Sequence, residues 1–146
     1  MPQPDASMAA EAGYVLDSSA LLALLLGEPG AERVQACLPD AVVGSVNLAE
    51  ATTKLLHKGA EPAAVQSILE GLRLEIVPWT ETLVWASLDL CPFAWTRGLS
   101  LGDRACMALA RTLHRKALTA DAAWVAVGNL VRPAIAVELF RPPRRS

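Results

Sequence analysis

The stretch YVLDSSALLALLLGEPG, residues 14–30, joins a short apolar run to a longer one through three polar residues. Tyr14 to Leu16 has the composition and length of a buried strand, and Asp17 and Ser18 are residue types that commonly cap helices. The apolar residues 20–26 predict a helix, which the glycines and the proline of the final GEPG end. The stretch therefore predicts a strand that passes directly into a helix, with an acidic side chain at the junction.

The same alternation of short apolar runs and helical segments continues along the chain. The other predicted strands are 41–43, 74–77, 117–119 and 135–137. The predicted helices are 30–38, 46–58 with Ser45 as cap, 62–72, 80–91 and 100–114, with a loop at 93–99 and a turn or short helix at 121–125. Continuous apolar runs are typical of parallel strands that helices cover on both faces. We therefore predict an α/β fold with a central, mostly parallel sheet of four to five strands flanked by helices.

Length and composition indicate one folded domain. The chain has 146 residues, of which 53% are hydrophobic and 19% are charged, so it can bury a core. We expect a flexible leader at 1–12, a domain at 13–140 and a basic tail at 141–146. The longest apolar stretch, 20–26, is too short to cross a membrane. The absence of a basic start and the three scattered cysteines predict a cytoplasmic protein with reduced thiols.

Four acidic side chains fall where the predicted fold would bring them together. Asp17 follows the first strand, Asp121 follows the fourth, and Glu50 and Asp103 lie in the first turns of two helices. The carboxyl ends of parallel strands meet at one edge of a sheet, so we expect the four carboxylates to gather there. Asn47 lies three residues before Glu50, on the same helical face.

A cluster of four carboxylates predicts a hard divalent cation, because like charges held together raise each other's pKa. Mg²⁺ or Mn²⁺ prefers such oxygen ligands, and the ion can activate a water for phosphodiester cleavage. Each acid also has a structural alternative. Asp17 and Asp121 could cap helices, and Glu50 could be a first-turn acid that the helix dipole favours. Asp103 could complete a capping box with Ser100.

Four segments of the chain resemble, in order, the motifs of PIN domains, and specifically of VapC-like toxin ribonucleases. They are VLDSSA at 15–20, SVNLAE at 45–50, GLSLGDRAC at 98–106 and ALTADAAW at 117–124. The last two segments are the more specific. The resemblance covers about residues 13 to 140 and implies a three-layer PIN-like fold. It also implies that the chain is a Mg²⁺-dependent endoribonuclease that acts as the toxin of a toxin–antitoxin pair.

The resemblance also implies roles for individual residues. It carries metal binding and catalysis to Asp17, Glu50, Asp103 and Asp121, and support of these acids by hydrogen bonds to Ser18, Asn47 and Thr119. It implies an RNA substrate, a cognate antitoxin that blocks the site, and a homodimer. One position departs from the pattern: Ala122 stands where many relatives have Arg, which puts one phosphate contact in doubt.

Basic residues concentrate toward the C-terminus. Residues 97–146 hold 9 of the 13 Lys and Arg residues, whereas residues 1–96 hold 12 of the 15 acids. Arg104, Arg111 and Arg115 follow one another at spacings that place them on one helical face, where they could bind RNA phosphates. Arg97 lies in the segment FAWTR at 93–97, whose aromatic rings could stack on unpaired bases. A solvated helix face and core packing of the two aromatics are the structural alternatives.

Leucines at 21, 22, 25 and 26, together with those at 48, 55 and 56, form an apolar stripe that could serve a dimer or antitoxin groove, with ordinary core as the alternative. A non-catalytic PIN-like RNA-binding or interaction module is the main alternative function, and the presence of all four acids argues against it. A receiver-type phosphoryl-transfer domain is disfavoured, because Ser18 follows Asp17 where a second acid would be needed. A P-loop or dinucleotide-binding fold is disfavoured because no glycine-rich loop follows the first strand.

Overall fold

A five-stranded parallel sheet forms the centre of the computed structural model, which describes residues 13–143. The predicted leader and the last three residues of the predicted tail lie outside the described residues. The strand order is β3-β2-β1-β4-β5, and every neighbouring pair is parallel. The strands are β1 (Tyr14–Leu16), β2 (Ala41–Gly44), β3 (Glu75–Val77), β4 (Lys116–Thr119) and β5 (Val137–Leu139). The predicted α/β fold with a parallel sheet is confirmed, although β5 begins two residues later than the apolar run suggested.

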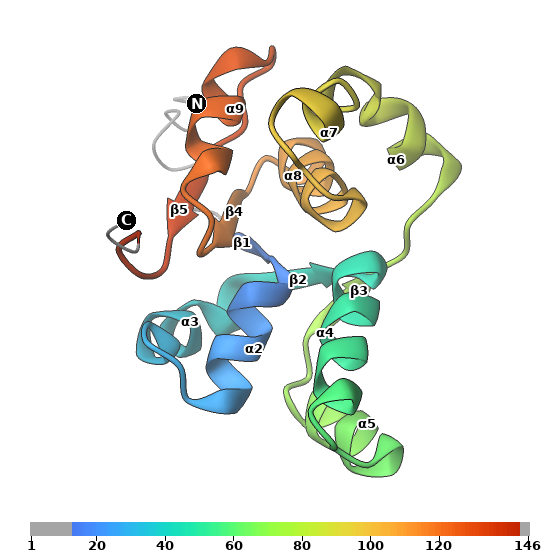
Figure 1. Ribbon diagram of the computed structural model, residues 1–146, viewed down its shortest axis with the longest axis vertical. Helices are drawn as coiled ribbons and strands as arrows, with labels where there is room; N and C mark the ends of the chain where they lie inside the picture. Colours follow the sequence, from blue (N-terminus) through green and yellow to red (C-terminus); the bar gives the residue numbers. More distant parts are fainter. Residues whose placement is uncertain (1–12, 144–146) are drawn as a thin grey trace, which may run out of the picture.

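Helices cover both faces of the sheet, so the molecule has three layers (Figure 1). Figure 1 shows α2 and α3 on one side of the strands and α8 and α9 on the other, with α4 and α5 beside α2. The helices on the first side are α2 (Ser18–Leu26), α3 (Ala31–Cys37), α4 (Ser45–His57) and α5 (Pro62–Gly71). The other helices are α6 (Glu81–Ala86), α7 (Phe93–Thr96), α8 (Leu101–Leu113) and α9 (Ala123–Leu130), and two 3-10 turns lie at Leu38–Asp40 and Leu88–Leu90.

The central strands bury side chains on both faces, which explains why they are continuous apolar runs. Val15 of β1 packs into the cluster that contains α8 and the fully buried Trp124 of α9. The next residue, Leu16, points to the opposite face and packs with α2 and α3. Because successive side chains of a strand alternate between faces, two separate core clusters flank one thin sheet.

Several predicted element boundaries are wrong, for local reasons. The N-cap of α4 is Gly44, not Ser45, and the Ser45 hydroxyl instead accepts a hydrogen bond from Trp79 N at 2.9 Å. The helix predicted at 80–91 ends at Ala86, whose carbonyl accepts a bond from the Arg111 side chain at 2.9 Å. The predicted loop at 93–99 contains the short helix α7, and α9 extends further than the turn or short helix expected at 121–125.

Within residues 13–143, no helix combines the length and the apolar character that crossing a membrane would need.

Candidate active site

Asp17 lies at the junction of β1 and α2, where it is the N-cap of the helix and only 5% exposed. Its Oδ1 accepts a hydrogen bond from Ser18 N at 2.8 Å, and its Oδ2 accepts bonds from the hydroxyls of Ser19 and Thr119, both at 2.8 Å. Asn47 Nδ2 lies 3.4 Å from Oδ1. Burial raises the pKa of Asp17 despite these donors. The carboxylate is therefore fixed in position but is poorly solvated.

Thr119, at the end of β4, connects Asp17 to Asp121. Its hydroxyl donates to Asp17 and accepts a hydrogen bond from Asp121 N at 3.2 Å. The Asp121 side chain is exposed, and its Oδ1 accepts a bond from Ala123 N at 3.0 Å. Ser19 makes a parallel link, because its hydroxyl accepts a bond from Ala120 N at 3.2 Å. The ends of β1 and β4 thus hold two acids of the predicted cluster at one rim of the sheet.

Glu50, on α4, is positioned by Asn47 and Gly102. Asn47 Nδ2 lies 3.3 Å from Glu50 Oε1 and donates to Gly102 O at 3.0 Å, while the buried Asn47 Oδ1 has no hydrogen-bond partner in the described chain. A Cβ atom at Gly102 would overlap the Glu50 carboxylate. Burial, and then repulsion by Asp17, raises the pKa of Glu50, whereas the Ser18 hydroxyl lowers it. Glycine at 102 therefore leaves the space that Glu50 occupies.

Asp103, in the first turn of α8, completes the predicted capping box. Its Oδ2 accepts a bond from Ser100 N at 2.8 Å, and its own N donates to Ser100 Oγ at 3.1 Å. Burial raises the pKa of Asp103, the bonds from Ser100 lower it, and repulsion by Asp121 raises it further. Asp103 is thus a capping residue and also an acid that lies close enough to Asp121 to interact with it.

Three of the four acids line one open cavity of about 480 Å³, namely Asp17, Asp103 and Asp121. Glu50 is not among the lining residues of this cavity, but it lies close by: Asn47 Nδ2 contacts both Glu50 and Asp17, and burial, then repulsion by Asp17 and Asp103, raises the pKa of Glu50. Two cations, Lys54 and Arg141, also line the cavity. The arrangement places carboxylates and cations around one space that is open to solvent.

The donor set fits a hard divalent cation, since it consists of carboxylate oxygens that raise one another's pKa. In the conformation described for residues 13–143, however, no three Asp, Glu, His or Cys side chains form a group that could hold a metal ion. Asp103 and Asp121 each use one oxygen to bond the backbone at a helix start. These caps use Asp103 Oδ2 and Asp121 Oδ1, so the second oxygen of each acid remains for a ligand.

The family assignment comes from comparison with known proteins. The family model of the PIN domain matches residues 14–130. The chain belongs to the PIN-domain family. No curated protein matches it.

Solved structures share the fold of this PIN domain at low sequence identity. One is VapBC2 from Rickettsia felis bound to a promoter DNA fragment, with a TM-score of 0.65, 15% identity, and coverage of 88% of this chain and 98% of that chain. DNA-bound VapBC from Salmonella typhimurium has a TM-score of 0.66 and 15% identity, with coverage of 88% of this chain and 98% of that chain. FitAcB from Neisseria gonorrhoeae has a TM-score of 0.58 and 21% identity, with coverage of 85% of this chain and 95% of that chain.

Sequence reasoning did not single out four residues at the site of this PIN domain. Ser19 and Lys54 could have been found from their spacing in the sequence, because Ser19 is two residues after Asp17 and Lys54 is about one helical turn after Glu50. Gly102 stands inside the SLGD motif, but its role depends on a contact with another helix. Arg141 was predicted only as the first residue of a basic tail, because its place at the cavity depends on the three-dimensional fold.

The arginines predicted to bind RNA do not line the acidic cavity. Arg111 forms a two-pronged ion pair with Asp89, with distances of 2.7 and 2.8 Å, so its guanidinium is already engaged in holding the η2 turn (Leu88–Leu90). Arg104 Nε donates to Ser100 O at 3.3 Å. Arg115 lies beyond the end of α8 and donates to Asp40 O at 3.3 Å, so the prediction that it shares a helical face with Arg104 and Arg111 is wrong.

Arg97 is exposed and is the C-cap residue of α7. Of the two aromatic side chains before it, Phe93 packs against the core, whereas Trp95 is 75% exposed. Core packing is thus confirmed for Phe93 and wrong for Trp95.

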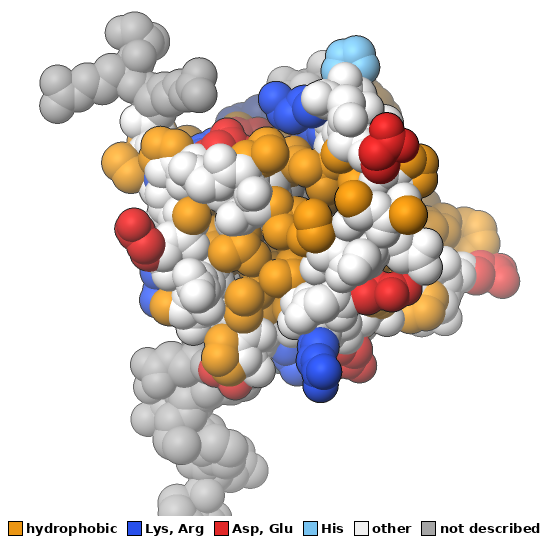
Figure 2. Space-filling model, turned by 90° about the horizontal axis from the view of Figure 1, so that it is seen from below, with side chains coloured by type: hydrophobic (Ala, Val, Ile, Leu, Met, Phe, Trp, Pro, Cys, Tyr) orange, Lys and Arg blue, Asp and Glu red, His pale blue; other side chains and the backbone are white. Residues whose placement is uncertain are grey.

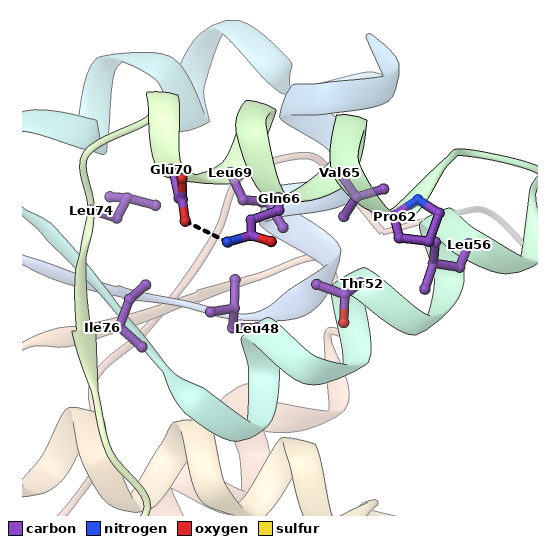
Figure 3. A pocket seen from close by; sticks show the side chains of 10 residues that line it. All are labelled: Leu48, Thr52, Leu56, Pro62, Val65, Gln66, Leu69, Glu70, Leu74 and Ile76. Atoms are coloured by element: carbon purple, nitrogen blue, oxygen red, sulfur yellow. Dashed lines mark hydrogen bonds between the residues drawn. The ribbon is translucent and has the colours of Figure 1, made fainter.

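A second cavity, of about 570 Å³, is an apolar groove between α4, α5 and β3 (Figure 3). Figure 2 shows hydrophobic side chains gathered across the middle of the face seen from below. Of the predicted leucine stripe, Leu48 and Leu56 line the groove, while Leu21 and Leu22 are buried in the core. The residues lining the groove are Leu48, Thr52, Leu56, Pro62, Val65, Gln66, Leu69, Glu70, Leu74 and Ile76.

Proposed function

We propose that this PIN domain is a divalent-metal-dependent endoribonuclease that acts in the cytoplasm as the toxin of a toxin–antitoxin pair. One observation carries the proposal: the buried carboxylate of Asp17, held by Ser18, Ser19 and Thr119, faces a cavity that Asp103 and Asp121 also line. Keeping such a group charged at neutral pH is costly without a cation. Membership of the PIN family and the likeness to VapBC and FitAB structures support the same reading.

The residues that would hold Mg²⁺ or Mn²⁺ are Asp17, Asp103 and Asp121, with Glu50 as a fourth. When bound, the ion supplies an activated water and neutralises charge that develops on the phosphodiester. Thr119 and Ser19 keep the Asp17 carboxylate in one orientation through their hydroxyl donors. Asn47 restrains Glu50 beside Asp17.

The capping acids can serve both the fold and the site. Asp103 Oδ2 and Asp121 Oδ1 satisfy backbone N–H groups at the starts of α8 and α9, which fixes where each carboxylate stands. The second oxygen of each side chain can then turn toward the cavity without breaking the cap. Local capping chemistry therefore positions the reactive groups and does not compete with them.

The partners belong to the same proposal. VapBC from Salmonella typhimurium and FitAB, a further structure with a similar fold, were each solved bound to DNA. We propose that this chain has a cognate antitoxin and forms a homodimer. The apolar groove beside α4 and α5 is the surface that we assign to the antitoxin, because a large apolar surface open to solvent favours binding of another protein. RNA is the substrate at the acidic cavity.

A non-catalytic RNA-binding module is the second candidate function. It is favoured by one observation: in the described part of the chain, no three acidic, histidine or cysteine side chains stand ready to hold an ion. The two functions differ in whether bound RNA is cut.

The deciding experiment incubates total cellular RNA with the wild-type protein, Asp103→Asn and Asp121→Asn, with Mg²⁺ and with a chelator, and maps the cleavage sites. Both variants retain a side-chain carbonyl that can cap its helix, so they should fold while losing cleavage. Glu32→Gln is the matched control, because Glu32 is exposed on α3 away from the cavity. Equal Mg²⁺-dependent cleavage by both variants would remove the proposed site, and binding without cleavage by the wild type would favour the second candidate.

A further inference from the structure

The two cations of the acidic cavity come from parts of the chain that are far apart in the sequence. Lys54 lies on α4, and Arg141 follows β5 directly after Phe140. The remaining lining residues are acidic, small or proline, so these side chains are the only cations along the wall of that cavity within residues 13–143. A polyanion that approached the three carboxylates would be repelled unless cations at the same opening offset their charge.

Packing against the turn between α2 and α3 holds Arg141 at the cavity. Arg141 Nη1 donates to Pro29 O at 3.1 Å, and its guanidinium lies over the Phe140 ring at 5.1 Å. Phe140 is 5% exposed, and its N donates to Thr119 O at 3.2 Å. Gly30, at φ +91°, allows close approach, because a Cβ there would strike Phe140 and crowd Arg141. The position of Arg141 is therefore built by the fold.

The charge of Arg141 is only partly compensated by its neighbours. The nearest acid is Glu28, at 3.9 Å from Nη1, and the bond to Pro29 O uses one of the five N–H donors of the guanidinium. Two prolines follow Arg141 and also line the cavity, and their fixed φ angles restrict the backbone there. Donors thus remain for a ligand at a restrained position.

Lys54 is the more exposed of the two cations. Its side chain is exposed, and none of the four ion pairs within residues 13–143 includes it. It nevertheless lies close enough to Glu50 and Asp103 to lower the pKa of both. An ammonium group on a flexible stem, near the carboxylates but without a close partner, suits a diffuse contact with phosphate.

We propose that Arg141 and Lys54 form a cationic clamp that binds the RNA backbone phosphates at the mouth of the acidic cavity. The proposal rests on the proposed nuclease function and deepens it, by assigning substrate binding to these two side chains and not to the arginines of α8. Ala122, which lines the same cavity, offers a second place from which an introduced arginine could reach the phosphate.

The test measures binding of a single-stranded RNA oligonucleotide by fluorescence anisotropy in chelator, where metal-dependent cleavage cannot proceed. Lys54→Met and Arg141→Met remove the charge but retain apolar bulk, and each should weaken binding about 10-fold, as expected for a lost charged hydrogen bond. Each should also reduce the slope of log affinity against log salt by about 0.7, as expected for one phosphate contact with single-stranded RNA. Arg141→Lys should retain most of the affinity, and Ala122→Arg should restore binding to Arg141→Met.

Lys58→Met is the matched control, because Lys58 is an exposed lysine one turn after Lys54 that does not line the cavity. Wild-type affinity and salt slope in both clamp variants, or an equal loss in the control, would overturn the clamp. Cleavage in Mg²⁺ is scored separately. If the wild-type protein cuts RNA and both clamp variants keep the wild-type KM for RNA, the clamp is ruled out. A chain that binds RNA through these cations without cutting it has the clamp but is not a nuclease.

Discussion

Replacing Gly102 with alanine should reduce the activity of this PIN domain without reducing its stability. Gly102 is the second residue of α8, and a Cβ at this position would overlap the carboxylate of Glu50. The overlapping atoms are the far end of a flexible side chain, so Glu50 can rotate away while the backbone stays in place. The substitution should therefore displace Glu50 from its place beside Asn47 without unfolding the chain.

The expected stability change is small and favourable. Alanine is preferred over glycine within a helix by up to about 1 kcal/mol, which corresponds to roughly 3 °C in Tm for a chain of this size. Moving Glu50 also separates it from Asp17, whose charge raises the pKa of Glu50. Misplacement of a reacting group by about 1 Å costs roughly 100-fold in rate. We therefore expect an unchanged or slightly higher Tm, with cleavage reduced about 100-fold.

The assay compares Gly102→Ala with Gly71→Ala, in Mg²⁺-dependent RNA cleavage and in thermal unfolding. Gly71 ends α5, and a Cβ there would meet no atom within 4 Å, so the control makes the same chemical change in open space. In a Glu50→Ala background, Gly102→Ala should have little further effect on cleavage, because the overlap is gone. Full activity of Gly102→Ala would refute the role given to Glu50, and a loss of several kcal/mol would show that the backbone moves instead.

Other substitutions and conditions test the remaining contacts. Arg111→Met should lower the free energy of unfolding by about 1–2 kcal/mol, because the hydrogen bonds to Asp89 and to the Ala86 carbonyl are lost. The RNA affinity measured by fluorescence anisotropy should stay unchanged, and weaker binding would show that Arg111 contacts RNA. Thr119→Val removes a buried donor to Asp17 and should cost about 1–3 kcal/mol in urea unfolding, with weaker Mn²⁺ binding by calorimetry; unaltered binding would contradict the supporting role. The pKa of Asp17, Glu50 and Asp103 is raised in the folded protein, so these carboxyls bind more protons in the folded state than in the unfolded state. The Tm of the metal-free protein should therefore rise as the pH falls from neutral toward the unfolded pKa values near 4, and a divalent ion should raise the Tm more at neutral than at acidic pH. A Tm that rises with pH in this range would contradict the raised pKa of these acids.

The sequence predicts the parts of the site that depend on strand ends and helix starts. Asp17 and Thr119 are 102 residues apart, but Asp17 follows β1 and Thr119 ends the neighbouring parallel strand β4, and this alone places them at one rim. The capping box of Ser100 and Asp103 is a local pattern, and it forms as predicted. These features follow from short-range chemistry and from the rule that parallel strands end together.

The parts that could not be predicted depend on contacts between distant side chains. Nothing near Arg111 in the sequence indicates that Asp89, 22 residues earlier, binds it and removes it from the surface. The place of Arg141 depends on how Phe140 packs against the turn at Gly30. The Glu50 carboxylate occupies space that Gly102 leaves open, and this contact depends on the crossing of α4 and α8.

The most direct test of the central claim is the position of a bound ion in crystals grown with Mn²⁺, located by its anomalous scattering. We predict one ion in the acidic cavity, with oxygens of Asp17 and of at least one of Asp103 and Asp121 at about 2.1 Å, and we predict that the ion is lost in Asp103→Asn. A fully loaded crystal in which Mn²⁺ avoids this cavity, while the protein still cleaves RNA, would contradict it.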